Sequence, residues 1–229
     1  MHQTFTAGHE EATVQYIRSI VVDHYDFDIQ RIEFVAHSDK FVCTLTTTAG
    51  EKFNVFVYLS VKGLDYEHYK YKRRESILQE VAFLQAVDRE TDVQVPVPQA
   101  NRKGEFLTPI YIPSCNAITS LMVASFIEGC PMGPEDEDYL EKCVLAGLAA
   151  AKLHQVSRRN FSDFNSNDRP IHRHGWAIQI RSDIERGLPL GTISEADFAV
   201  ICEGLDYIDS VMTKLDNVEG SRGFVHTDL

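Results

Sequence analysis

The apolar residues of this chain change their spacing near Gly129, and this change limits the fold more than any other feature of the sequence. Before Gly129 apolar residues mostly alternate with polar ones, as they do in strands that bury one face. After Gly129 they recur every three or four residues, which is the period of an amphipathic helix. Strands first and helices afterwards predict an α+β fold in two lobes, residues 1–125 and 126–229.

The first lobe is expected to contain five strands and two helices. Apolar residues at helical spacing indicate helices over residues 6–25 and 75–87. Strands are expected over residues 31–37, 41–47, 52–59, 105–112 and 120–127, the first three joined as an antiparallel meander. The prolines in residues 95–98 cannot lie inside a helix, so the second helix must end before them.

Two long helices are expected in the second lobe. The first covers about residues 135–155 and carries an apolar stripe of Leu140, Val144, Leu148 and Ala151. The second begins where Ser194 and Asp197 resemble a capping box. Its apolar residues are Phe198, Ile201, Leu205, Ile208, Met212 and Leu215.

Charge and composition exclude several classes of partner. The chain has 34 acidic residues against 22 Lys and Arg, a net charge of -12, which disfavours non-specific nucleic-acid binding. No apolar run reaches the roughly 18 residues of a membrane-spanning helix, and the first residues lack the layout of a signal peptide. The five cysteines form no C-x-x-C pair. We therefore expect a soluble cytoplasmic protein with no nucleic-acid or membrane partner.

The most specific pattern lies in residues 223–229, where His226 and Asp228 follow a long helix in the order small-apolar-apolar-His-x-Asp-Leu. It resembles the catalytic loop of the aminoglycoside phosphotransferase and choline kinase family, the small-molecule branch of the protein-kinase-like fold. Residues 121–129 resemble the hinge strand of that family, and residues 148–154 resemble its Leu-Ala-x-Leu-His helix. The resemblance covers about residues 11–229 and implies a five-stranded antiparallel N-lobe with an incomplete helical C-lobe.

The resemblance also implies a function, namely ATP- and Mg²⁺-dependent transfer of a phosphoryl group to a hydroxyl of a small molecule. Asp228 then accepts or orients the proton of the attacking hydroxyl, and His226 shapes the loop. Main-chain groups of residues 123–126, including Ala124 and Phe126, are expected to recognise adenine, with Met122 beside the ring. The acidic balance mildly favours a cationic acceptor.

The expected phosphate site departs from the family pattern. Glu80 lies where the family places an acid that pairs with a basic residue of the third strand, but Phe56 occupies the position of that basic residue. Either Lys40, Lys52 or Lys62 supplies the charge from elsewhere, or nucleotide binding is weakened and Glu80 is an ordinary solvated residue.

The turn between the first two strands has no G-x-G-x-x-G pattern. The backbone amides of Ser38 to Lys40 are candidates for a phosphate contact, and an ordinary hairpin turn is the alternative.

The family also holds magnesium with an Asn and an Asp that follow the catalytic loop, and the sequence contains neither after Asp228. The sequence therefore predicts one of two proteins. One is a kinase that is truncated and inactive as given, with no metal ligands of its own. The other is a non-catalytic, pseudokinase-type binding module. A truncated helical lobe leaves apolar surface uncovered, so we expect self-association.

Overall fold

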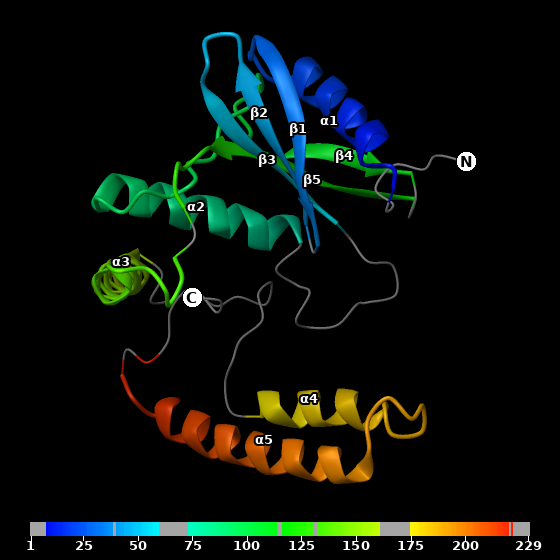
Figure 1. The fold of residues 1–229 in the computed structure, drawn as a ribbon, viewed down its shortest axis with the longest axis vertical. Coiled ribbons are helices and arrows are strands. Elements are labelled where there is room, and N and C mark those ends of the chain that lie inside the picture. The colour runs from blue at the N-terminus through cyan, green and yellow to red at the C-terminus, as the bar shows by residue number, and fades with distance from the viewer. Residues whose placement is uncertain are drawn as a thin grey trace.

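A five-stranded antiparallel sheet with helices on both faces forms the first half of the molecule (Figure 1). The computed structural model describes residues 8–38, 40–59, 73–113, 116–130, 132–160, 175–219 and 221. Its helices are α1 (Glu10–His24), α2 (Arg74–Glu90), α3 (Tyr139–Asn160), α4 (Trp176–Glu185) and α5 (Glu195–Leu215). Its strands are β1 (Ile29–His37), β2 (Lys40–Thr47), β3 (Lys52–Tyr58), β4 (Thr108–Ile112) and β5 (Ala117–Ser125).

The strands lie in the order β1-β2-β3-β5-β4. Each neighbouring pair is antiparallel, as the sequence predicts. The tight turn between β2 and β3 is closed by hydrogen bonds from Thr47 and Gly50, and Gly50 adopts a φ of 85° that favours glycine. The β-meander is thus encoded locally, in alternating strands and short turns.

One face of the sheet packs against α1 and forms the main core. Along β2, Phe41, Cys43 and Leu45 are buried and alternate with half-buried residues. They pack with Ile17 and other apolar residues of α1. This alternation follows from the pleat, which turns successive side chains to opposite faces. It leaves Lys40, Val42 and Thr44 on the other face.

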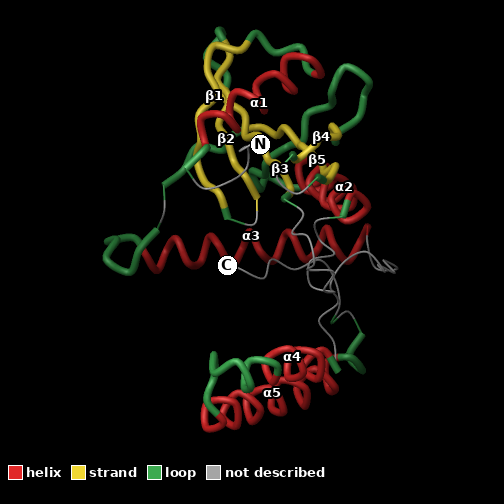
Figure 2. The backbone as a smooth tube through the Cα atoms, turned by 90° about the vertical axis from the view of Figure 1, so that its right-hand side faces the viewer, coloured by secondary structure: helices red, strands yellow, loops and turns green. Residues whose placement is uncertain are grey.

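The opposite face of the sheet packs against α2 through a smaller cluster. Tyr58 of β3 and Met122 of β5 are buried there with Ile77 and Val81 of α2. The two views in Figures 1 and 2 show α1 and α2 on different sides of the sheet. The sheet is therefore covered on both faces, and α2 covers its face only in part, since Val42 and Phe56 remain half-buried.

The helices after the sheet make fewer contacts than their apolar stripes suggest. α3 packs on α2 mainly through its C-terminal half, where Val156 meets Ala86 and Val87. The stripe predicted from the sequence faces solvent in its N-terminal half, with Leu140, Val144 and Leu148 exposed by 78%, 63% and 54%. α4 and α5 pack against each other and lie side by side in both figures.

Several element boundaries differ from the sequence-based ones. β4 starts at Thr108 rather than 105, because Asn101 accepts hydrogen bonds from the backbone of Lys103 and Glu105 and holds that stretch in a turn. α3 extends to Asn160, five residues beyond its expected end. The predicted N-cap of α5 is confirmed, since the Ser194 hydroxyl accepts the backbone N–H of Asp197. Among the described residues, no helix is both long and apolar enough to cross a bilayer.

The reactivity of Cys43 tests whether the main core excludes solvent. Burial raises the pKa of the Cys43 thiol to about 12, so the neutral thiol is favoured until the pH approaches that value. The thiolate is the nucleophile, so Cys43 is expected to resist iodoacetamide at pH 8, while the exposed Cys130 reacts. Peptide mapping after alkylation, with a urea-unfolded sample as control, measures both. Equal labelling of the two cysteines in the folded protein contradicts the packing described here.

Candidate functional site

The candidate site lies on the sheet face that α2 covers only in part. Antiparallel register places its residues side by side across three strands, because Val42 pairs with Phe56 and Phe56 pairs with Met122. Its members come from β2, β3 and β5 and alternate with the core residues: Lys40, Val42, Asn54, Phe56, Met122 and Ala124. We call this set the platform. The platform is mostly apolar, and its one charged side chain belongs to the first residue of β2.

Lys40 carries that charge, and it lies close to an acid and two aromatic rings. Its ammonium nitrogen is 4.0 Å from Glu80 Oε1, and the two side chains are 26% and 30% exposed. The same nitrogen lies 4.8 Å from the centre of the Tyr58 ring and 5.6 Å from that of Phe56. Aromatic faces attract cations at these distances. The structure thus brings together Lys40, Glu80 and Phe56, which the sequence singles out separately.

Lys52 is paired elsewhere. Its ammonium nitrogen is 2.7 Å from Glu128 Oε1 and 5.2 Å from the centre of the Phe126 ring. These contacts tie the start of β3 to the segment that follows β5. Lys62 lies outside the described residues. Of the three lysines considered from the sequence, Lys40 is therefore the one that the described structure places beside Glu80.

The backbone after Met122 is already well paired. The Val123 carbonyl accepts the Gln99 N–H at 2.8 Å, and the Ser125 N–H donates to the Val97 carbonyl at 2.9 Å. The Phe126 N–H donates to the Lys52 carbonyl at 3.3 Å. Adenine recognition by residues 123–126 stays a prediction. Because the N–H groups of Ser125 and Phe126 are already hydrogen-bonded, adenine would have to bind to other backbone groups of this segment.

Two further predicted contacts can be placed. Met122 is 2% exposed and its sulfur lies 4.0 Å from the Tyr58 hydroxyl, so it forms the back of the platform rather than an open surface. Ser38 is exposed, and its N–H donates to the Lys40 carbonyl at 3.1 Å. This bond already uses the Ser38 N–H. Asp39 lies outside the described residues, so the phosphate contact and the ordinary hairpin turn both stay predictions for this segment.

His226 and Asp228 lie outside the described residues, so their roles stay predictions from the sequence. Within the described part of the chain, no group of three His, Cys, Asp or Glu side chains gathers to hold a metal ion. The platform as defined contains no carboxylate, and Asn54 is its one side chain with an oxygen that could ligate a cation.

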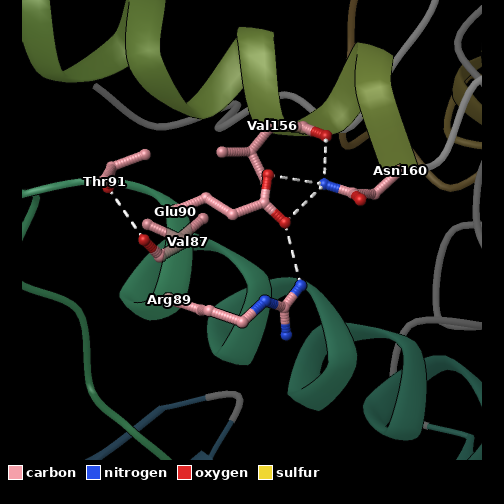
Figure 3. Close-up of polar contacts among 6 residues, drawn as sticks. All are labelled: Val87, Arg89, Glu90, Thr91, Val156 and Asn160. Carbon is pink, nitrogen blue, oxygen red and sulfur yellow. Dashed lines mark hydrogen bonds and ion pairs between the residues drawn. The ribbon is translucent and has the colours of Figure 1, made fainter.

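A polar junction that the sequence does not predict joins α2 and α3 (Figure 3). Asn160 Nδ2 donates to both carboxylate oxygens of Glu90 at 3.1 Å and to the Val156 carbonyl at 3.1 Å. Arg89 donates to Glu90 at 2.8 Å. The Asn160 amide and the Arg89 guanidinium hold the pKa of Glu90 below its usual value. The junction fixes the end of α2, the helix that carries Glu80.

No signal in the sequence pairs Glu90 with Asn160, because the two residues are 70 positions apart and meet only when α3 packs on α2. A second contact of the same kind joins Lys152 of α3 to Asp92, just after α2. Both contacts are solvent-exposed, so they orient the helices more than they stabilise the fold.

No protein-family model and no curated protein matches the chain. Among solved structures, it is similar to amicoumacin kinase hAmiN in complex with AMP-PNP, Ca²⁺ and Ami, with a TM-score of 0.60 and 18% identity. The match covers 96% of this chain and 61% of the kinase chain. The chain has a protein-kinase-like fold. The similarity agrees with the family resemblance found in the sequence and confirms the predicted α+β fold class.

A microcompartment-associated aminopropanol kinase is also similar, with a TM-score of 0.47 and 17% identity over 62% of this chain and 40% of that one. The chain thus spans less than two thirds of either kinase. The roles of the platform and of Glu80 in nucleotide binding stay predictions from the sequence resemblance.

Proposed function

We propose that the protein is an ATP-dependent phosphotransferase that acts on a hydroxyl group of a small molecule. One observation carries the proposal: the likeness to a small-molecule kinase extends over 96% of the chain. The kinase was solved with AMP-PNP and Ca²⁺, which supports use of a nucleotide and a divalent cation here as well. A fold alone does not imply a function, so the proposal also draws on the sequence of the site, namely the acid at Glu80 and the His-x-Asp pattern of residues 226–228.

Each candidate residue then has a role in phosphoryl transfer. A bound Mg²⁺ would neutralise charge at the phosphates, although the described residues contain no group of His, Cys, Asp and Glu side chains to hold it. The platform offers an apolar surface for the adenine ring of the nucleotide. Asp228 accepts or orients the proton of the acceptor hydroxyl, and His226 shapes the loop that carries Asp228. The acceptor is proposed to be a small cationic molecule, such as an amino alcohol or an amino sugar, because the protein carries a net charge of -12. A cytoplasmic location is part of the same proposal.

The second candidate is a pseudokinase-type module that binds a ligand at the platform without turnover. Phe56 favours it, because an aromatic ring stands where the family has its phosphate-binding cation. The exposed half of the α3 stripe favours the self-association that the sequence predicts.

Calorimetric titration with ATP, first with and then without Mg²⁺, tests the proposal. We expect MgATP to bind with a micromolar to millimolar dissociation constant, the usual range for enzyme substrates. Acceptor-dependent release of ADP, measured over a panel of amino alcohols and amino sugars, then separates the two candidates. Binding with turnover supports the phosphotransferase, and absence of nucleotide binding contradicts the proposed function. Binding alone is the result expected of the module, and also of a kinase that is inactive as given.

A further inference from the structure

We infer that Lys40 of β2 is the cation that holds the nucleotide phosphates in this chain, in place of the β3 residue whose position Phe56 occupies. The inference rests on the proposed function, since it assigns a residue to the phosphates of the same nucleotide. It moves the positive charge to a neighbouring strand. The sequence alone leaves Lys40, Lys52 and Lys62 as equal alternatives.

The register between β2 and β3 explains how the side chain of a β2 residue can reach the space beside Phe56 of β3. Val42 is the direct partner of Phe56, and Lys40 is two residues from Val42, so its side chain projects from the same face of the sheet. Diagonal neighbours of this kind are about 7–8 Å apart at their Cα atoms, within reach of a long side chain. The 5.6 Å contact between the Lys40 ammonium and the Phe56 ring shows that Lys40 spans this gap.

Three neighbouring side chains position the Lys40 ammonium. Glu80 approaches from α2 at 4.0 Å, which supports the charge by attraction but is too long for a hydrogen bond. A lysine ammonium has three N–H donors, and the contact with Glu80 uses none of them as a hydrogen bond. Tyr58 and Phe56 contact the same group through their ring faces. Lys40 is thus held in place with donor capacity suited to a phosphate.

The environment of Lys52 points to a different role. Its 2.7 Å contact with Glu128 is a direct charge-assisted hydrogen bond, and its ammonium lies over Phe126 at the end of the sheet. Lys52 therefore links β3 to the segment after β5. It also provides a matched control, because it is a partly exposed lysine of the same sheet that pairs with an acid and an aromatic ring.

The first experiment compares MgATP binding by the wild-type chain, Lys40→Met and Lys52→Met. Loss of one charge-assisted contact to a phosphate is expected to weaken MgATP binding by about 10- to 100-fold in Lys40→Met. Lys52→Met is expected to weaken binding by a smaller factor than Lys40→Met, because its ammonium lies beside Phe126 and Glu128 and not beside Glu80. Binding is measured by calorimetry, so the result does not depend on turnover or on the acceptor. Thermal unfolding of each variant verifies that it is folded.

The second experiment returns the cation to β3. In the double variant Lys40→Met/Phe56→Lys, the new ammonium starts from the strand position that the family uses and lies on the same face as Glu80. We expect it to recover most of the lost affinity. Adding Glu80→Gln to the wild-type chain is expected to weaken binding by a smaller factor, because Glu80 orients the cation and does not itself contact the phosphates.

The outcomes separate this inference from the proposed function. If the wild-type chain binds MgATP and Lys40→Met binds it equally well, the inference is wrong while the proposed function stands. The same holds if Lys62→Met, and not Lys40→Met, loses affinity. If the wild-type chain binds no nucleotide, both are wrong. Loss of affinity in Lys40→Met with recovery in the double variant supports both.

Discussion

Replacing Asp228 with Asn is expected to lower phosphoryl transfer by about 10²- to 10⁴-fold while leaving MgATP affinity nearly unchanged. The amide has almost the shape of the carboxylate but cannot accept the proton of the attacking hydroxyl. Because the base acts in the transition state, its loss lowers kcat and kcat/KM by a similar factor. This split distinguishes the proposed base from a residue that only supports the fold.

The measurement is acceptor-dependent ADP release, with calorimetric MgATP binding on the same samples. Asp88→Asn is the matched control, because Asp88 is an exposed carboxylate of α2 that is not part of the platform. The control is expected to retain full activity. Activity of Asp228→Asn within about threefold of wild type contradicts its assignment as the base. A parallel loss of MgATP affinity indicates that Asp228 acts in binding or folding instead.

The fold was largely predictable because its strands and helices carry their own periodicity. β2 buries every second residue, and β3 continues the pattern after a glycine turn, so the meander follows from local sequence. The errors arise where a side-chain hydrogen bond or the packing partner of a helix decides the outcome, and apolar periodicity does not report either. The side chain of Asn101 turns the stretch before β4, and the N-terminal half of the α3 stripe is exposed although its pattern is that of a buried face.

The candidate site was predictable in its parts but not in its assembly. Glu80 and the missing cation at Phe56 can be recognised from sequence position, whereas the choice of Lys40 cannot. That choice depends on the β2–β3 register and on where α2 lies over the sheet. The contact between Glu90 and Asn160 likewise exists only after α3 has packed on α2. Tertiary geometry decides which of several charged residues meet.

Replacing Ile17 with Ala is expected to lower the free energy of unfolding by about 2–5 kcal/mol. Ile17 is fully buried between α1 and the sheet, so truncation removes apolar contacts and leaves a cavity. Val22→Ala in the same helix is the matched control, because Val22 is 47% exposed and Ala is the better helix former. That variant is expected to change the stability by less than about 0.5 kcal/mol. Urea unfolding followed by circular dichroism measures both.

The effect of Ile17→Ala on stability also bears on the site. The core around Ile17 includes Phe41 and Cys43, whose neighbours along β2 are Lys40 and Val42 of the platform. A fully packed core on one face therefore fixes the strand that presents the platform on the other. If Ile17→Ala and Val22→Ala lower the stability equally, α1 does not pack on the sheet as described. If only Ile17→Ala is destabilising, the result supports the packing of α1 on the face of the sheet opposite the platform.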